Sequence, residues 1–239
     1  MNIDYKKLHQ FTSLNRRIFD IPYQSNGETK NYLDRFSNRL GEKEDAPFIG
    51  YIGERYLQQR VKVVFVGKAG GESSNNDNVV DDSLYETFLE FKNTRHHESG
   101  YSNYSKEYKK ALENWKISIY IKEFLFHTEL NLEDISYFNV VPFRYKGSPL
   151  KSVLKIAFHN YASDFLNLVQ ADMIVPLGTN IPIYDLWNSG YKPWKIFSGI
   201  SRTNGDTWID ERGRKCLSLC IDDYTHQKRA KGPKLKLIK

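Results

Sequence analysis

The chain has 239 residues, a length that fits one sizeable α/β core with an appendage at either end. Charged residues make up 27% and hydrophobic residues 40%, and no stretch approaches the roughly 18 consecutive apolar residues of a membrane helix. The N-terminal MNIDYKKLHQFTSL lacks an apolar stretch after its charges, so we expect no signal peptide. The lack of such an apolar stretch excludes a membrane-spanning helix, and the presence of only two cysteines favours the reducing cytoplasm.

The net charge of +6 is concentrated at one end. Residues 227–239 carry six basic residues and no acid, whereas the other 29 basic residues balance the 29 acids. We predict a flexible basic tail over 227–239. Such a tail attracts a phosphate backbone, although a terminus that only keeps the protein soluble would look the same.

Apolar periodicity predicts the elements in chain order. Residues 1–60 read as helices packed on the core, from the spacing of Leu8, Phe11, Leu14 and Ile18 and then of Tyr32, Phe36 and Leu40, after a turn-like QSNGE. Beyond them, short apolar runs at 61–66, 135–141, 172–177, 195–197 and 215–221 are typical of strands. Helical patterns begin at Ser83, cover 105–129 and 152–169, and pass through Tyr184 and Trp187.

Strands that alternate with helices indicate an α/β domain over 61–226, with a mainly parallel sheet of four or five strands covered on both faces. Ligands of such sheets bind at the carboxyl ends of the strands. The loops after Val66, Val141, Leu177 and Phe197 should therefore share one cleft.

The first of these loops is rich in glycine: Gly67, Lys68, Ala69, Gly70 and Gly71. Its spacing fits neither a P-loop nor G-x-G-x-x-G. Glycines let a backbone approach a ligand and present its amides, but a plain tight turn explains them equally well.

The second loop follows an asparagine inside an apolar run. We expect the Asn139 amide to be buried and in need of partners, and its donors and acceptor suit the edge of a nucleobase. Arg144, Lys146 and Ser148 follow it and suit a phosphate backbone. The structural alternative is an asparagine that ties two loops together.

The late loop contains Ser201, Arg202 and Asn204, whose donors suit phosphates, although an ordinary turn would look similar. His96 and His97 could suggest a metal, but no matching third ligand is evident, so we expect no metal.

Four segments together resemble the signature regions of the uracil-DNA glycosylase superfamily. They are VKVVFVGKAGGES, YFNVVPFRYKGSP, ADMIVPLGTNIPIYDLW and IFSGISRTNGDTW, in that order over residues 61–208. The family patterns are G-Q-D-P-Y-H or G-E-A-P-G after a strand, then N-V-V, L-G and H-P-S. The resemblance implies a three-layer αβα sandwich and an enzyme that flips a base out of DNA and hydrolyses its bond to the sugar.

The resemblance also implies residue roles. Asn139 would bind the flipped pyrimidine, the loop Gly67 to Gly71 would border the base and hold a water, and Ser201 would grip a phosphate. We add Tyr85 to the base-binding candidates. No cofactor is implied, the expected partner is DNA without a membrane, and we expect a monomer.

The departures from the family pattern concern catalysis. Ala69 stands at the water-activating Asp of one branch, Lys68 at the Glu of another, and the late-loop His is missing. Glu72 and Asp77 are the carboxylates we expect to position the water instead, with Glu72 first because it lies closest to the glycines. Each of them could equally be part of a solvated loop.

One departure suggests the substrate. Gly71 stands where the uracil-specific branch has a tyrosine beside C5 of the pyrimidine. This favours a bulky C5-modified pyrimidine, such as the glucosylated hydroxymethylcytosine of phage DNA, and a role in antiviral defence. The alternatives are a uracil-DNA glycosylase of base-excision repair, a catalytically inactive DNA-binding relative, and a nucleotide-binding α/β enzyme unrelated to DNA.

Overall fold

The computed structural model describes residues 2–19, 22–31, 46–70, 78–126, 128, 130–144, 149–177, 195–196, 218–220 and 234–236. The helices are α1 (Tyr5–Gln10), α2 (Asn78–Asn93), α3 (His97–Asn114), α4 (Ser118–Phe126), α5 (Lys151–Ala157) and α6 (Ser163–Val169). Short 3₁₀ helices are η1 (Phe11–Ser13), η2 (Arg16–Phe19), η4 (Tyr56–Gln58) and η5 (Leu132–Asp134), and η6 (Phe158–Ala162) is a π-helical turn. The strands are β1 (Pro22–Ser25), β2 (Glu28–Asn31), β3 (Tyr51–Ile52), β4 (Val63–Gly70), β5 (Ile135–Arg144), β6 (Met173–Pro176), β7 (Lys195–Ile196), β8 (Ser218–Cys220) and β9 (Lys234–Lys236).

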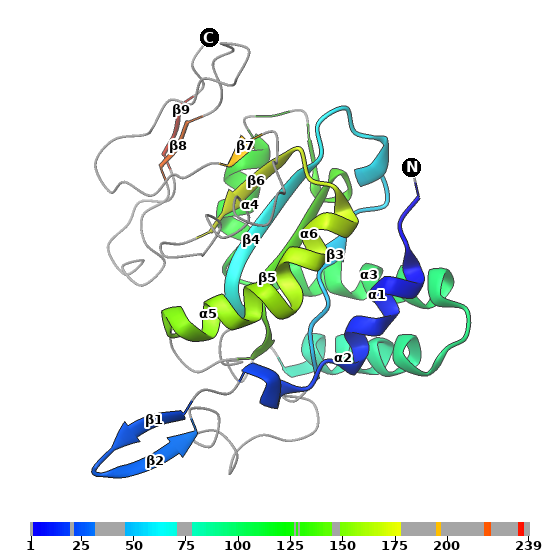
Figure 1. Cartoon of the computed structure of the whole chain (residues 1–239). Coiled ribbons are helices and arrows are strands. Elements are labelled where there is room, and N and C mark those ends of the chain that lie inside the picture. The colour runs from blue at the N-terminus through cyan, green and yellow to red at the C-terminus, as the bar shows by residue number, and fades with distance from the viewer. Residues whose placement is uncertain are drawn as a thin grey trace.

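The central sheet has five strands in the order β3-β5-β4-β6-β7 (Figure 1). The pairs β5–β4, β4–β6 and β6–β7 are parallel, whereas β3 runs antiparallel to β5 at one edge. This mixed open sheet with helices confirms the predicted α/β class. The edge strand β3 was not predicted, because two residues carry no readable period.

Helices pack against both sides of β5. Tyr137 lies 6.3 Å from Tyr108 of α3 between ring centroids, and its chain neighbour Phe138 lies 4.8 Å from Phe165 of α6 on the opposite side. In Figure 1, α5 and α6 cross one side of the sheet, and α2 and α3 lie together away from them. Alternate side chains of one strand thus enter two different apolar layers.

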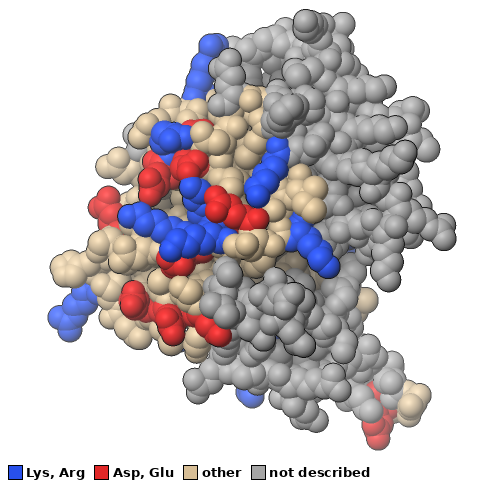
Figure 2. All heavy atoms as spheres, turned by 180° about the vertical axis from the view of Figure 1, so that it is seen from behind, with Lys and Arg blue, Asp and Glu red and all other residues tan. Residues whose placement is uncertain are grey.

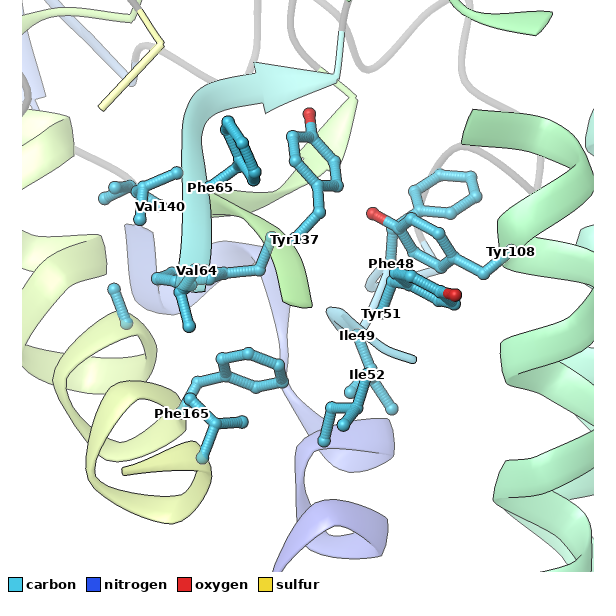
Figure 3. Packing of buried hydrophobic residues seen from close by; sticks show 14 of the residues in the cluster. Phe48, Ile49, Tyr51, Ile52, Val64, Phe65, Tyr108, Tyr137, Val140 and Phe165 are labelled. Carbon is cyan, nitrogen blue, oxygen red and sulfur yellow. The ribbon is translucent and has the colours of Figure 1, made fainter. Parts of the chain in front are cut away.

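Tyrosine hydroxyls fasten the segment that leads into β3. Tyr101 and Tyr104, one turn apart on α3, donate to the carbonyl oxygens of Gly50 (2.7 Å) and Ile49 (2.8 Å). The amide of Gly50 donates to the hydroxyl of Tyr161 (3.0 Å). Because burial raises the pKa of the Tyr101 and Tyr104 phenols, both stay protonated and able to donate. Figure 3 shows neighbouring members of this core, with Tyr108 reaching toward Tyr137.

The glycine-rich segment is strand rather than loop as far as Gly70, so the predicted strand end at Val66 was wrong. Gly67 pairs with Asn139 and Ala69 with Val141 in the β4–β5 ladder. The partner strand continues beyond this point and supplies the hydrogen-bonding groups that a glycine-rich segment needs to stay extended.

β5 also exceeds its predicted end at Val141 and includes Pro142. The register shifts there, since Ala69 faces Val141 but Gly70 faces Arg144. A proline is tolerated in a bulge because no ladder bond from its nitrogen is needed. Its carbonyl oxygen accepts from the amide of Phe48 at 2.6 Å.

The helix predicted over 105–129 is in fact two helices, α3 and α4, and α3 begins at His97. Trp115 ends α3 with extended backbone (φ −72°, ψ 145°), and its ring packs 5.4 Å from that of Tyr108. The Trp115 ring is partly buried and packs against the core at the point where the helix ends. α2 begins at Asn78, five residues before the predicted start at Ser83. The predicted helix over 152–169 is confirmed, with η6 in its middle.

The N-terminal region contains α1, η1 and η2 followed by a β-hairpin that was not predicted. Asn26 and Gly27 have positive φ (53° and 79°) in the two-residue connection between β1 and β2. That turn fits the twist of a hairpin. The hairpin projects from the body in Figure 1. The expected helical pattern of Tyr32, Phe36 and Leu40 lies outside the described residues.

Only residues 218–220 of the strand predicted at 215–221 are described, and they do not pair with the central sheet. Its described part, β8, pairs antiparallel with β9 in a separate two-stranded sheet. β9 lies within residues 227–239 and is close to β8 along the chain, which favours local pairing.

Candidate functional site

The candidate site lies where β4 and β5 run side by side toward their carboxyl ends. Gly67 and Asn139 are register partners in this parallel pair. On the other side of β4, the carbonyl oxygen of Val66 accepts from the amide of Leu177 at 2.7 Å, at the end of β6. Three chain segments far apart in sequence therefore end close together, as expected for a ligand site in an α/β sheet.

Asn139 is a buried amide with a defined partner. Its side chain is 4% exposed, and its Oδ1 accepts a hydrogen bond from the hydroxyl of Tyr137 at 2.9 Å. Within the described part of the chain no acceptor is found for its Nδ2. The expected burial of Asn139 is confirmed. Among the described residues, the hydrogen bond found for its side chain stays within β5.

Gly67 is required by the position of that amide. A Cβ placed on Gly67 would lie 3.0 Å from the Tyr137 hydroxyl and 3.3 Å from Cγ of Asn139, and would overlap Oδ1. Gly70 differs, because a Cβ there would meet Arg144 at ordinary contact distances of 3.7 and 3.8 Å. Only the first of these glycines is dictated by close approach.

Two arginine side chains, from Arg16 and Arg144, lie at the end of β5 and contact aromatic rings there. The guanidinium of Arg144 lies 5.3 Å from the centroid of the Phe48 ring. Its carbonyl oxygen accepts from Nη2 of Arg16 at 2.6 Å, and the Arg16 guanidinium lies 5.9 Å from the Phe143 ring. A buried arginine from η2 thus holds the N-terminal region to the strand end at the candidate site.

The structure brings several of the predicted residues together and leaves others out. Gly67, Lys68, Ala69 and Gly70 lie on β4 beside β5, which carries Asn139 and Arg144. Tyr85 lies on α2, partly buried, with its ring stacked on Phe88 at 6.4 Å. Outside the described residues are Gly71, Glu72, Asp77, Lys146, Ser148, Ser201, Arg202 and Asn204.

Sequence reasoning missed two contributors, Tyr137 and Arg16. The position of Tyr137 did carry a signal, since residues two apart on a strand share a face and Tyr137 precedes Asn139 by two. Nothing in the sequence indicated Arg16, which reaches Arg144 across 128 residues.

Histidines meet away from this site. His97 stacks on His9 with ring centroids 4.1 Å apart, and Nε2 of His9 lies 3.0 Å from the carbonyl oxygen of Lys92. Among the described residues, no group of three or more His, Cys, Asp or Glu side chains is arranged to hold a metal ion.

The described surface seen in Figure 2 mixes both signs of charge rather than forming a single basic face. Ion pairs among the described residues include Arg55 with Asp134 (2.9 Å) and Lys110 with Glu107 (2.5 Å). No helix within the described ranges is long and apolar enough to cross a membrane.

Comparison with protein-family models and with curated protein sequences gives no match for this chain. Its assignment to a function therefore depends on the residues of the site.

Proposed function

We propose that the chain is a DNA glycosylase that flips out a C5-modified pyrimidine and hydrolyses its bond to the sugar. The observation that supports this best is the buried Asn139 amide beside Gly67, near the carboxyl ends of parallel strands. A buried amide with donor hydrogens left over is suited to the polar edge of an extruded base. The three-layer αβα arrangement of the family that the sequence resembles is part of the same proposal.

Hydrolysis of the bond between base and sugar requires mainly a hydrogen-bond donor placed at the base and a water placed at the sugar. Negative charge develops on the departing base as its bond to the sugar breaks, and a fixed N–H donor stabilises that charge most where water is excluded. Asn139, 4% exposed, is such a donor. We assign the water to a carboxylate, Glu72 first and Asp77 second, because Lys68 and Ala69 leave β4 without one.

We assign DNA contacts to basic and polar groups beyond the strand ends. Arg144 ends β5, and Lys146, Ser148, Ser201, Arg202 and Asn204 are the further candidates in the sequence. Gly71 stands where a uracil-specific enzyme carries a ring, and from that difference we infer a base with a bulky C5 group. Glucosylated hydroxymethylcytosine in phage DNA is one such base, and excising it from invading DNA in the cytoplasm would serve antiviral defence.

The test is an excision assay on oligonucleotides that carry uracil, hydroxymethyluracil, hydroxymethylcytosine or its glucosylated form. Alkali then breaks the strand wherever an abasic site was made. We expect breaks with at least one C5-modified base, and a loss of about a hundredfold in rate for Asn139→Ala. Asn160→Ala, which removes an exposed asparagine bonded to the carbonyl oxygen of Ile156 on its own helix, should leave excision unchanged.

The outcomes separate the candidate functions. Breaks with uracil alone would support a repair uracil-DNA glycosylase instead. Ala69 and Lys68, at positions where the family carries acids, favour a second candidate, a relative that binds DNA without cleaving it. Salt-sensitive DNA binding with no breaks on any substrate would support that second candidate and rule out the glycosylase.

A further inference from the structure

We infer that the Arg144 guanidinium binds a DNA phosphate and that residues from two distant segments hold it in place, Arg16 through its main chain and Phe48 through its side chain. The inference rests on the proposed function, because it takes DNA to be the partner, but it does not depend on which base is excised. It makes Arg16 and Phe48 positioning residues that act through Arg144.

Arg144 lies at the edge of the sheet where a ligand is expected. It is the last residue of β5, and its register partner on β4 is Gly70. A Cβ on Gly70 would lie 3.7 Å from Cγ of Arg144, so the arginine side chain starts beside the glycine-rich strand end. Ligands of parallel sheets bind beyond the carboxyl ends of the strands. A base extruded toward this edge brings its neighbouring phosphates to the same place.

The main chain at Arg144 is held by Arg16. Nη2 of Arg16 donates to the carbonyl oxygen of Arg144 at 2.6 Å, a hydrogen bond strengthened by the positive charge of the donor. Arg16 is 7% exposed, and its guanidinium lies 5.9 Å from the centroid of the Phe143 ring. The Phe143 ring packs on Phe19 of η2, with ring centroids 5.3 Å apart. The segment η2 therefore fixes the last two residues of β5.

The side chain of Arg144 is held by Phe48. Its guanidinium lies 5.3 Å from the centroid of the Phe48 ring. Phe48 is buried, donates its amide to the carbonyl oxygen of Pro142 at 2.6 Å, and meets the ring of Trp115 edge-on at 6.4 Å. A ring fixed in this way limits the positions that a guanidinium above it can take. A side chain ordered in advance loses less entropy when it binds a ligand.

The chemistry of this arrangement suits a phosphate. Stacking uses the face of a guanidinium, whereas a phosphate is bound by the N–H groups in its plane, so Arg144 can do both at once. A planar, weakly hydrated guanidinium matches phosphate oxygens better than an ammonium does. The register shift between Ala69 and Gly70 marks a bulge at this strand end, and bulges redirect side chains near functional sites.

DNA binding by the full chain, measured by fluorescence anisotropy at several salt concentrations, tests the inference. The probe is a duplex with one tetrahydrofuran residue, a stable analogue of the abasic product. We expect Arg144→Met to weaken binding about tenfold. The slope of log affinity against log salt should become shallower by about 0.9, the value for one phosphate contact on duplex DNA.

Arg60→Met is the matched control for the loss of charge. Arg60 is exposed and precedes β4, so it lies at the amino end of that strand, away from the candidate site. Its replacement removes the same single charge and should leave the slope unchanged.

Arg16→Met and Phe48→Leu test positioning. Each should lose most of the affinity that Arg144→Met loses, and neither should weaken binding further when combined with Arg144→Met, because both act through that side chain. Arg16→Lys keeps a charged donor for the carbonyl oxygen of Arg144 and should bind within about threefold of wild type. Phe48→Leu changes no charge, and it tests the inference even if Arg16→Met does not fold.

Three results would overturn the inference alone: unchanged binding by Arg144→Met, unchanged binding by a folded Arg16→Met or Phe48→Leu, or losses that add up in the double variants. If the affinity of the wild-type chain for the duplex is unmeasurable or does not fall with salt, DNA is not the partner and the proposed function fails with the inference.

Discussion

The side-chain oxygen of Asn139 occupies the space that a Cβ on Gly67 would need, so these two residues of neighbouring strands determine each other. A larger residue at 67 displaces the amide, and the amide fills what would otherwise be a gap beside the glycine. The relationship makes the glycine part of the site's geometry, although it carries no functional group of its own.

Gly67→Ala should destabilise the fold and disturb the amide together. The added methyl group overlaps Oδ1 of Asn139 and lies 3.0 Å from the Tyr137 hydroxyl, so side chains must shift in a packed strand pair. We expect a loss of about 1–3 kcal/mol in the free energy of unfolding, measured by urea denaturation.

Gly70→Ala is the matched control, three residues further along the same strand. Its methyl group would meet Arg144 at 3.7 Å, an ordinary contact, so the free energy of unfolding should change by less than about 0.5 kcal/mol. Equal losses for the two variants would show that glycine is needed in this strand for another reason than the Asn139 amide.

Much of the fold was predictable because its signals are local. Runs rich in β-branched residues gave β4, β5 and β6 within a few residues, since strands buried on both faces are apolar throughout. The predicted ends of the strands and helices were wrong where contacts between distant segments determine them. Gly67 to Gly70 extend because β5 lies beside them, and α3 ends at Trp115 because that ring packs on Tyr108.

The candidate site was predictable in part for a similar reason. A polar amide within an apolar run is unusual, and this pattern identified Asn139 as a candidate. Gly67 was a candidate because it directly follows the apolar run 61–66. The spacing of two residues puts Tyr137 on the same face of the strand as Asn139, but only the structure shows that its hydroxyl donates to the Asn139 amide. Arg16 could not be found from sequence, since only the folded chain brings it to Arg144.

Tyr101→Phe and Tyr104→Phe should each lower the free energy of unfolding by about 1 kcal/mol. Each variant leaves a backbone oxygen, that of Gly50 or Ile49, without its hydroxyl donor in the core, while the packing of the ring is unchanged. Urea denaturation of the three proteins, wild type included, measures the difference.

Tyr108→Phe is the control within the same helix. Its hydroxyl is buried, and no hydrogen-bond partner for it is found in the described part of the chain. Tyr108→Phe removes a buried hydroxyl that makes no hydrogen bond there, so the free energy of unfolding should stay the same or rise. A loss as large as that of Tyr104→Phe would mean that the Tyr108 hydroxyl has a partner in solution.

Asp134→Asn should destabilise the protein by about 1–3 kcal/mol. The residue is buried, and its carboxylate accepts from Nε of Arg55 (2.9 Å), Nε2 of Gln59 (2.6 Å) and the amide of Asn131 (2.9 Å). Asp164→Asn, which removes an exposed carboxylate 3.8 Å from Lys7, should change stability by less than about 0.5 kcal/mol.

Protonation of the Asp134 carboxylate should also lower the free energy of unfolding in acid. The hydrogen bond from Arg55 holds the pKa of Asp134 below its ordinary value of 3.8, so the folded state prefers the ionised form. Its contribution is present above the ordinary pKa and disappears as the pH falls through the lowered one. The difference in the free energy of unfolding between wild type and Asp134→Asn, measured by urea denaturation at a series of pH values, should therefore shrink as the pH falls through the lowered pKa of Asp134.

His97 should make the protein less stable in mild acid. Partial burial, then the nearby His9 and then Lys6, lower the pKa of His97 below its ordinary value of 6.5, so the folded state prefers the neutral ring. Stability then falls as the pH drops below that ordinary value, and the loss is complete below the lowered pKa. The titration of the imidazole C2 protons by NMR measures the shift directly, and His9→Phe, which keeps a ring in the 4.1 Å stack without its charge, should make the shift smaller. A His97 ring that titrates at or above the ordinary value would show that the stack of the two histidines does not persist in solution.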